Sequence, residues 1–241
     1  MIKQAVISAG GFGTRLRPIT DTIPKPMIPI LGKPLLQWHI DQFRKAGVTE
    51  FFFALQYLPN VIRNYFKNGS GFGVKINYHV EEAPLGTAGC IKPFEKQLDG
   101  DFFYIYGDTF SLIDYAKMEA YWRSKPDAAA MERIGNPGTH TDSDTVETDQ
   151  EMRFLKIYGK HSGQNHPGAY RQRGSFIFKK KVLSYIPSDA PSQVGTELLP
   201  ALIAAGESCY GYLCDDYSKG IDTMEKWKEV EEYLRKQNRL E

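Results

Sequence analysis

The chain opens with the stretch QAVISAGGFGTRLRP (residues 4–18), in which a short apolar run leads directly into glycines and arginines. The run Ala5-Val6-Ile7 lacks strict alternation, which is typical of a strand buried on both faces. Three glycines within four residues let the backbone turn sharply and aim several N–H groups at one point. Arg15 and Arg17 add positive charge that suits phosphate oxygens. We therefore interpret Gly10–Arg17 as a phosphate-binding loop.

Two common phosphate-binding motifs are excluded at this loop. The dinucleotide fingerprint requires a further glycine three positions after Gly13, where Leu16 stands. A P-loop requires Gly-Lys-Ser/Thr, which Gly13-Thr14-Arg15 does not supply. A glycine-rich turn that only reverses the chain is the alternative. Such a turn would account for the glycines but not for the two arginines, so we favour the phosphate-binding interpretation.

Further along the first half, apolar runs alternate with helical patterns. The runs Phe51–Leu55 and Phe102–Tyr106 are typical of buried strands. Apolar residues spaced three to four apart predict helices that begin near Pro34, Pro59 and Asp114. Strands separated by helices form parallel sheets, so we expect an α/β fold in which helices flank a mostly parallel sheet.

Parallel sheets bind ligands in the loops beyond the carboxyl ends of their strands. Gly10–Pro18 and Gly107–Asp108 both follow predicted strands directly. We therefore expect functional residues in these two places, independently of any motif.

The second half of the chain is less regular. Residues 135–150 are polar and rich in turn residues, which predicts a long loop or a weak hairpin. The last segment carries Trp227, Val230 and Leu234 on one face, as expected of a docked amphipathic helix. Between these segments the pattern predicts a strand at Tyr170–Phe178, a helix at Gly195–Ala205 and a strand at Ser208–Leu213.

Composition excludes several classes of protein. With 30 basic and 29 acidic residues the net charge is +1, which lacks the electrostatic signature of a nucleic-acid-binding protein. No segment has the length of a membrane span, and residues 1–9 do not have the form of a secretory signal. The three cysteines include no Cys-x-x-Cys pair, so neither a disulfide framework nor a zinc ribbon is expected. These features predict a cytoplasmic protein that binds neither nucleic acid nor membrane.

A second motif follows the glycine loop. In Ile23-Pro24-Lys25-Pro26-Met27-Ile28-Pro29, prolines hold Lys25 in an extended backbone, although the motif alone would favour a solvated surface lysine. Together with the glycine loop and Gly32-Lys33-Pro34-Leu35, it closely resembles the opening signature of the sugar-nucleotide pyrophosphorylases, the nucleotidyltransferases that make NDP-sugars. The resemblance implies a Rossmann-like, mixed but mostly parallel sheet with a small substrate-binding lobe.

The resemblance also implies roles for charged residues. Arg15 and Lys25 match catalytic positions, and Asp108 in Tyr106-Gly107-Asp108 matches an aspartate that binds Mg²⁺. Asp222 matches the second metal aspartate, in a form closer to glucose-1-phosphate cytidylyltransferases. Asp222 and Glu225 also fit a helix N-cap with capping-box character, so metal ligand and helix cap stay open as alternatives.

The two substrates are assigned to different parts of the chain. The segment Glu81–Gly89 resembles the base-recognition segment, and a helix start at Gly86-Thr87 is compatible with that role. Lys160 takes the position of the lysine that meets the sugar phosphate, although Gly159 and His161 replace the usual glutamate and proline. Gly174 matches a glycine that lets the sugar lie against the backbone. The residues expected to bind nucleotide are Ser8, Ala9, Gly10, Gly11, Gly13, Thr14, Glu81, Gly86 and Thr87.

The implied domain is single, over residues 1–241. Residues 1–125 form a nucleotide-binding half, and residues 126–241 form an acceptor-binding half with the C-terminal helix; a β-helix acyltransferase domain is not expected.

The implied substrates are an NTP and a sugar 1-phosphate. Pro84–Gly89 resembles guanylyltransferases of mannose and heptose phosphates, whereas Ile221-Asp222-Thr223 indicates CTP, so CTP and GTP are both favoured. Two other functions stay open: a cytidylyltransferase acting on phosphocholine or another non-sugar phosphate, and a nucleotide-sensing homologue without catalysis. Formation of a homo-oligomer also stays open.

Overall fold

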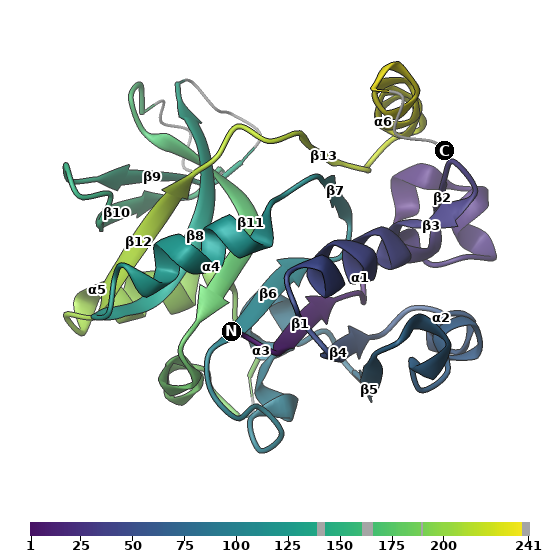
Figure 1. The fold of residues 1–241 in the computed structure, drawn as a ribbon, viewed down its shortest axis with the longest axis horizontal. Helices are drawn as coiled ribbons and strands as arrows, with labels where there is room; N and C mark the ends of the chain where they lie inside the picture. Colours follow the sequence, from purple (N-terminus) through teal and green to yellow (C-terminus); the bar gives the residue numbers. More distant parts are fainter. Residues whose placement is uncertain (139–142, 161–165, 189, 238–241) are drawn as a thin grey trace.

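The structure is a computed structural model that describes residues 1–138, 143–160, 166–188 and 190–237. Within these residues, nine strands form one mixed sheet with the order β10-β9-β11-β6-β1-β4-β5, and β8 and β12 are attached through β11 (Figure 1). The strands of the first half are β1 (Gln4–Ser8), β4 (Glu50–Leu55), β5 (Lys75–Val80) and β6 (Phe102–Tyr106). The helices of the first half are α1 (Leu35–Lys45), α2 (Pro59–Phe66), α3 (Gly86–Gly89) and α4 (Tyr115–Arg123).

The first half supplies the parallel part of the sheet. Strand β1 lies between β4 and β6 and pairs in parallel with both, so that Ser8 is opposite Ala54 on one side and Tyr106 on the other. The carboxyl ends of β1 and β6 are therefore neighbours. The glycine loop that follows β1 and the Gly107–Asp108 turn that follows β6 begin side by side.

The second half extends the sheet in antiparallel pairing. Strand β11 pairs antiparallel with β6, β8 and β9, while β12 pairs in parallel with β8. The strands are β8 (Ala128–Pro137), β9 (Thr145–Thr148), β10 (Phe154–Tyr158), β11 (Tyr170–Phe178) and β12 (Ser208–Leu213). The helical segments are a 3-10 helix (Lys180–Tyr185), a π-helical turn (Val194–Leu198) and α5 (Leu199–Ala204).

Two small two-stranded sheets lie outside the large one. One is formed by β2 (Pro29–Ile30) and β3 (Lys33–Pro34), and the other by β7 (Thr109–Ser111) and β13 (Ser218–Gly220). The C-terminal helix α6 (Met224–Lys236) follows β13 and packs near β2 (Figure 1). The pairing of β7 with β13 places the segment that leads into α6 next to Asp108, the residue before β7.

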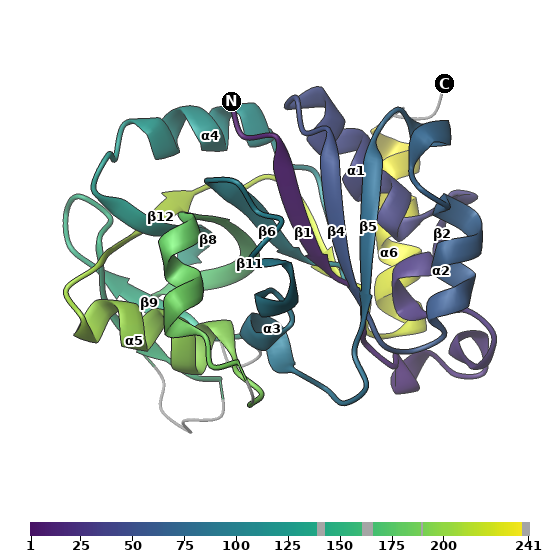
Figure 2. The same cartoon turned by 90° about the horizontal axis from the view of Figure 1, so that it is seen from below.

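Alternate residues of the buried strands enter different cores. Ile7 and Phe53 pack with α1, α2 and α4 on one face of the sheet, whereas Val6 and Phe52 pack with α3 and α5 on the other. Figure 2 shows β6, β1, β4 and β5 side by side, with β8 and β12 to one side and α6 to the other. A third, smaller core joins the glycine loop to α6 through Leu16 and Val230. Burial on both faces explains why these strands lack alternation.

The predicted fold class is confirmed, and the three helices that were predicted in the first half lie where the pattern placed them. The second half departs from prediction in two places. Residues 135–150, where a long loop or a weak hairpin was expected, contain the end of β8 and the whole of β9, which pairs with β10 and β11; residues 139–142 lie outside the described part of the chain. The helix predicted at Gly195–Ala205 starts as a π-helical turn at Val194. The π-helical turn brings Gly195 close to Asp144, where a Cβ would lie 2.7 Å from Oδ2.

Candidate active site

The glycine loop turns sharply at Gly13. Its φ is 63°, in the left-handed region, and a Cβ there would lie 2.9 Å from the Thr20 methyl group. Thr20 Oγ1 donates a hydrogen bond of 2.8 Å to the Gly13 carbonyl. The chain then forms a 3-10 turn (Thr14–Leu16) that buries Leu16 and leaves Arg15 exposed. The turn thus requires glycine and presents the Arg15 guanidinium at the carboxyl edge of the sheet.

Three predicted site residues meet at this edge. Lys25 Nζ donates hydrogen bonds to Asp108 Oδ2 at 2.8 Å and to Asp222 Oδ1 at 2.7 Å. Lys25 is 6% exposed and begins a 3-10 turn that follows Pro24. Asp108 follows β6, and its carbonyl accepts a hydrogen bond of 3.0 Å from Ile221 N. Strand pairing, backbone contact and the rigid Pro-Lys-Pro segment therefore bring together residues from three distant parts of the chain.

Two further cations surround Asp222. Arg15 Nη2 lies 3.3 Å from Asp222 Oδ1, and Lys226 Nζ lies 3.3 Å from Oδ2. Burial alone raises the pKa of Asp222, but the hydrogen bond and charge of Lys25, aided by Arg15 and Lys226, bring it below its ordinary value. Burial alone lowers the pKa of Lys25, but the two carboxylates bring it above its ordinary value. Lys25 and Asp222 are therefore both charged at neutral pH.

The donor set at Asp108 and Asp222 fits a magnesium ion. Oxygens of both carboxylates lie within 2.8 Å of one cationic nitrogen, so they converge on a single positively charged point. In the part of the chain that the structure describes, no group of three or more acidic, histidine or cysteine side chains could hold a metal. Mg²⁺ commonly takes one or two protein carboxylates and completes its shell with water and substrate phosphates.

Helix α6 has a different N-cap from the one considered above. Its cap is Thr223, whose Oγ1 accepts a hydrogen bond of 3.3 Å from Lys226 N. Asp222 instead directs its carboxylate at Lys25 and Arg15. The alternative that Asp222 caps the helix is therefore wrong, because its carboxylate forms ion pairs with the neighbouring cations and Thr223 provides the cap.

The predicted base-recognition segment is held against the loop before the π-helical turn. Glu81 Oε2 accepts a hydrogen bond of 2.9 Å from Leu85 N, which closes the turn before α3. Gly86 has a φ of 79°, and a Cβ there would overlap the Ser192 carbonyl. Thr87 Oγ1 donates to Gln193 Oε1 at 3.0 Å. These contacts explain the local need for glycine and fix the segment; its part in recognising a base stays a prediction.

A cleft of about 530 Å³ connects the charged cluster with the second half of the chain. Five predicted site residues line it: Arg15, Asp108, Lys160, Gly174 and Asp222. The backbone N–H of Lys160 donates to Asp144 Oδ1 at 2.9 Å, which positions the residue at the cleft. His161, which replaces the expected proline, lies outside the described residues. The cleft thus joins the predicted metal ligands to the predicted acceptor lysine.

Gly174 lies at the inner wall of the cleft. Its φ is 68°, and a Cβ would overlap the ring of Tyr106 at the end of β6. Its N–H donates a hydrogen bond of 3.1 Å to Glu132 Oε1. Packing against the Tyr106 ring therefore explains why this position is glycine. The contact of Gly174 with an acceptor stays a prediction.

Sequence reasoning missed several side chains of the cleft. Lys226 stands four residues after Asp222, a spacing that places both on one face at the start of a helix and could have indicated the contact. Glu132 and Asp144 lie in no motif, and only the three-dimensional pairing of β8, β9 and β11 brings them to the cleft. The remaining lining residues that were not predicted as site residues are Tyr106, Thr109, Ser143, Arg171, Gln172, Arg173, Ser218, Lys219 and Gly220.

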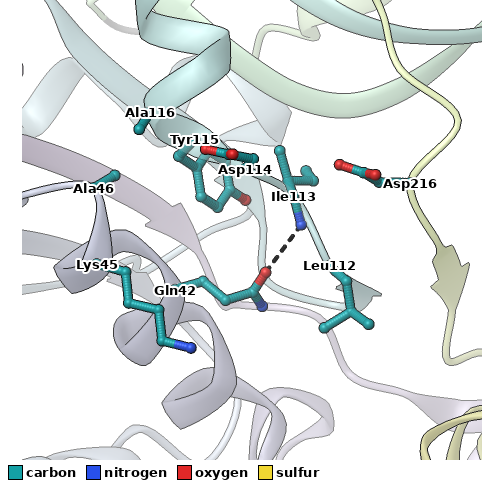
Figure 3. A pocket seen from close by; sticks show the side chains of 9 residues that line it. All are labelled: Gln42, Lys45, Ala46, Leu112, Ile113, Asp114, Tyr115, Ala116 and Asp216. Atoms are coloured by element: carbon teal, nitrogen blue, oxygen red, sulfur yellow. Dashed lines mark hydrogen bonds between the residues drawn. The ribbon is translucent and has the colours of Figure 1, made fainter. Parts of the chain in front are cut away.

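A second hollow of about 420 Å³ lies between α1 and α4 (Figure 3). Gln42 donates to the Ser111 carbonyl at 2.7 Å and accepts from Ile113 N at 3.1 Å, and Asp114 caps α4 by accepting from Lys117 N. These polar groups have structural roles, and the hollow contains none of the predicted site residues. The cleft at Asp108 is therefore the candidate active site.

No helix in the described part of the chain is long and apolar enough to cross a membrane.

Comparison with known proteins places the chain among nucleotide-transferring enzymes. The model of the nucleotidyl transferase family matches residues 4–233. Mannose-1-phosphate guanylyltransferase of Mycobacterium tuberculosis is 33% identical over 226 residues, 92% of this chain and 62% of the relative. D-glycero-alpha-D-manno-heptose 1-phosphate guanylyltransferase of Aneurinibacillus thermoaerophilus is 31% identical over 241 residues, 96% of this chain and 100% of the relative. The crystal structure of HddC from Yersinia pseudotuberculosis has a TM-score of 0.80 at 25% identity, covering 97% of this chain and 100% of that one.

The extent of these matches differs between relatives. The chain spans 62%, 58% and 52% of the length of three curated relatives, whereas it covers the whole of the Aneurinibacillus enzyme. The matches confirm the resemblance found in the opening motifs and the fold that it implied.

Proposed function

The chain belongs to the nucleotidyl transferase family, and from this premise we propose that it joins an NTP to a sugar 1-phosphate to give an NDP-sugar and pyrophosphate. The observation that carries the proposal is that Lys25 joins Asp108 and Asp222, and that both aspartates line the same cleft as Lys160. A cation and two carboxylates suit a metal–triphosphate, and a second lysine at the cleft suits a second phosphate.

The proposed reaction is an in-line displacement at the α-phosphorus. An oxygen of the acceptor phosphate forms a new bond to that phosphorus, and the bond to the bridging oxygen of the β-phosphate breaks, releasing pyrophosphate. Arg15 neutralises the leaving pyrophosphate, Lys25 holds the α-phosphate, and Lys160 anchors the acceptor phosphate. Positioning and charge stabilisation account for most of the catalysis in such transfers.

Asp108 and Asp222 would hold the magnesium ion. When bound, the ion would neutralise charge that develops on the reacting phosphates. Lys25 donates to both carboxylates, so a cation held by Asp108 and Asp222 would share their oxygens with the Lys25 ammonium group. The Arg15 side chain also contacts Asp222 and is 70% exposed.

The proposed nucleotide is GTP. Both sequence relatives described above are guanylyltransferases by name, and one is named for mannose 1-phosphate and the other for a heptose 1-phosphate. CTP, which Ile221-Asp222-Thr223 suggested, is less favoured on this ground. The phosphocholine and nucleotide-sensing alternatives have no support among these relatives. We propose a single catalytic domain over residues 1–241, located in the cytoplasm.

A pyrophosphate-release assay tests this function. ATP, CTP, GTP and UTP are each combined with mannose 1-phosphate, glucose 1-phosphate, a heptose 1-phosphate and phosphocholine in the presence of Mg²⁺. We expect release with GTP and at least one sugar 1-phosphate, and loss of release with EDTA. Release with CTP and phosphocholine only would replace the proposed acceptor, and no release despite tight NTP binding would favour the sensing alternative.

A further inference from the structure

Glu132 on β8 lines the cleft but takes no part in the cluster around Lys25. The residue is 1% exposed. Its Oε1 accepts hydrogen bonds from the backbone N–H of Arg173 at 3.2 Å and of Gly174 at 3.1 Å. Its Oε2 has no hydrogen-bond partner among the described residues. A buried carboxyl oxygen without a partner is costly, so this atom is expected to have one in the functional state.

The carboxyl group faces an interruption in the strand pairing. Gln172 of β11 pairs with Ile134 of β8, and Phe176 pairs with Glu132, so that three residues of β11 lie opposite one residue of β8. The bulge frees backbone N–H groups from the ladder, and Glu132 Oε1 accepts two of them. Bulges are common beside active sites because they redirect side chains and end regular pairing. The backbone thereby fixes one carboxyl oxygen, while the other oxygen of this cleft-lining residue is buried without a partner among the described residues.

The surroundings of Glu132 favour the protonated, uncharged form of its carboxyl group. Burial raises the pKa of Glu132 well above its ordinary value, and Asp144 raises it further, although the two backbone N–H groups oppose this. A carboxyl of this kind can donate to or accept from a hydroxyl group without the cost of an unpaired buried charge. Gln172 Nε2, on the neighbouring strand and lining the same cleft, also has no partner among the described residues.

We propose that Glu132 Oε2 hydrogen bonds to a hydroxyl group in the non-phosphate part of the acceptor. This inference rests on the proposed function and deepens it, because it makes Glu132 a specificity-determining residue for polyhydroxylated phosphates. Arg15 and Lys160, which carry the proposed phosphate contacts, line the same cleft. An acceptor whose body has no hydroxyl group leaves Glu132 Oε2 unsatisfied, and a site with an unpaired buried polar group discriminates strongly against such a ligand.

Two variants separate this role from a purely structural one. Glu132→Gln keeps one oxygen to accept from the Arg173 and Gly174 N–H groups and replaces only the second oxygen by an NH₂ group. Glu132→Ala removes both. Glu151→Gln is the matched control, because Glu151 is an exposed carboxylate that does not line the cleft.

Binding is measured by calorimetry with mannose 1-phosphate and glucose 1-phosphate, and with the 2-, 3-, 4- and 6-deoxy analogues of the sugar that binds more tightly. Pyrophosphate release and GTP binding are measured in parallel. We expect Glu132→Ala to weaken sugar phosphate binding about tenfold or more, Glu132→Gln to weaken it less, and Glu151→Gln to leave it unchanged. One deoxy analogue should bind equally weakly to the natural protein and to Glu132→Ala, while GTP binding is unchanged in every variant.

The outcomes distinguish the two proposals. Equal weakening of all analogues by Glu132→Ala, accompanied by weaker GTP binding, would show a structural role and overturn the inference. The inference would also be overturned if neither mannose 1-phosphate nor glucose 1-phosphate bound to the natural protein. Coupling to one hydroxyl group without pyrophosphate release under any condition would support the inference and reject the proposed transferase activity.

Discussion

Asp222 accepts a 2.7 Å hydrogen bond from Lys25, which lies 197 positions earlier in the chain. The same ammonium group donates to Asp108 at 2.8 Å, so one buried cation holds two carboxylates that come from the ends of β6 and β13. This contact joins the glycine-loop region to the C-terminal helix. It also makes the stability of the protein without ligand depend on the groups proposed to bind metal and phosphate.

Replacing Lys25 should therefore make stability depend on magnesium. We expect Lys25→Met to lower the free energy of unfolding by about 1–3 kcal/mol in EDTA, because two carboxylates lose their shared partner while solvent reaches Asp108. Millimolar MgCl₂ should restore part of this loss, as a cation that binds the folded state stabilises it. Urea unfolding with and without MgCl₂ provides the measurement. Lys33→Met is the control, because its pair with Asp41 is more exposed and should be worth at most about 1 kcal/mol. An equal magnesium effect in both variants would contradict the prediction.

The acid stability of the protein should depend on Asp222. Its folded-state pKa lies below the ordinary value of 3.8, so its contribution to stability is full above pH 3.8 and is lost as the pH falls through the folded pKa. We expect Asp222→Asn to be less stable than the natural protein at pH 7 and to lose less stability between about pH 5 and pH 2. Urea unfolding at several pH values measures both effects. Parallel curves for the two proteins would exclude Asp222 as a source of the acid dependence.

Much of this site could be predicted because its residues lie in continuous motifs at strand ends. The apolar run before Gly10 and the Gly-Asp after Tyr106 indicate where parallel strands end, and such ends converge in any sheet of this kind. Asp108 could therefore be placed at the carboxyl edge of the sheet from its position after a strand. Lys25 could be assigned to the same site from its Pro-Lys-Pro motif.

The remaining features depend on tertiary contacts. Thr223 caps α6 because neighbouring cations direct Asp222 elsewhere, although both residues have suitable side chains for a cap. Glu132 reaches the cleft through a bulge in β11, and a bulge leaves no mark in a local pattern of apolar residues. A single polar residue within a strand, such as Glu132, therefore cannot be identified as a cleft residue without the pairing of β8 with β11.

Gly174 should not tolerate a side chain. We expect Gly174→Ala to cost about 2–4 kcal/mol, because the left-handed φ of 68° adds about 1 kcal/mol to the overlap of the new Cβ with the Tyr106 ring. Gly206→Ala is the control, since Gly206 has a φ of 80° with no atom within 4 Å of a new Cβ, and should cost about 1 kcal/mol. Urea unfolding of both variants tests the difference. Equal losses would show that backbone conformation alone, and not the Tyr106 contact, requires glycine.

Arg15 should affect turnover far more than folding. Its side chain is 70% exposed and pairs with Asp222 at 3.3 Å, and exposed pairs of this kind contribute at most about 1 kcal/mol to stability. Arg15→Ala should reduce pyrophosphate release by about 100-fold or more, because it removes positive charge from the proposed leaving group. Arg235→Ala is a closely matched control: Arg235 is 60% exposed and pairs with Glu231 at 3.2 Å on α6, outside the cleft. Near-normal release by Arg15→Ala, with Arg235→Ala equally active, would remove Arg15 from the mechanism. A large loss confined to Arg15→Ala, with both variants unfolding at the same urea concentration, would assign the effect to catalysis.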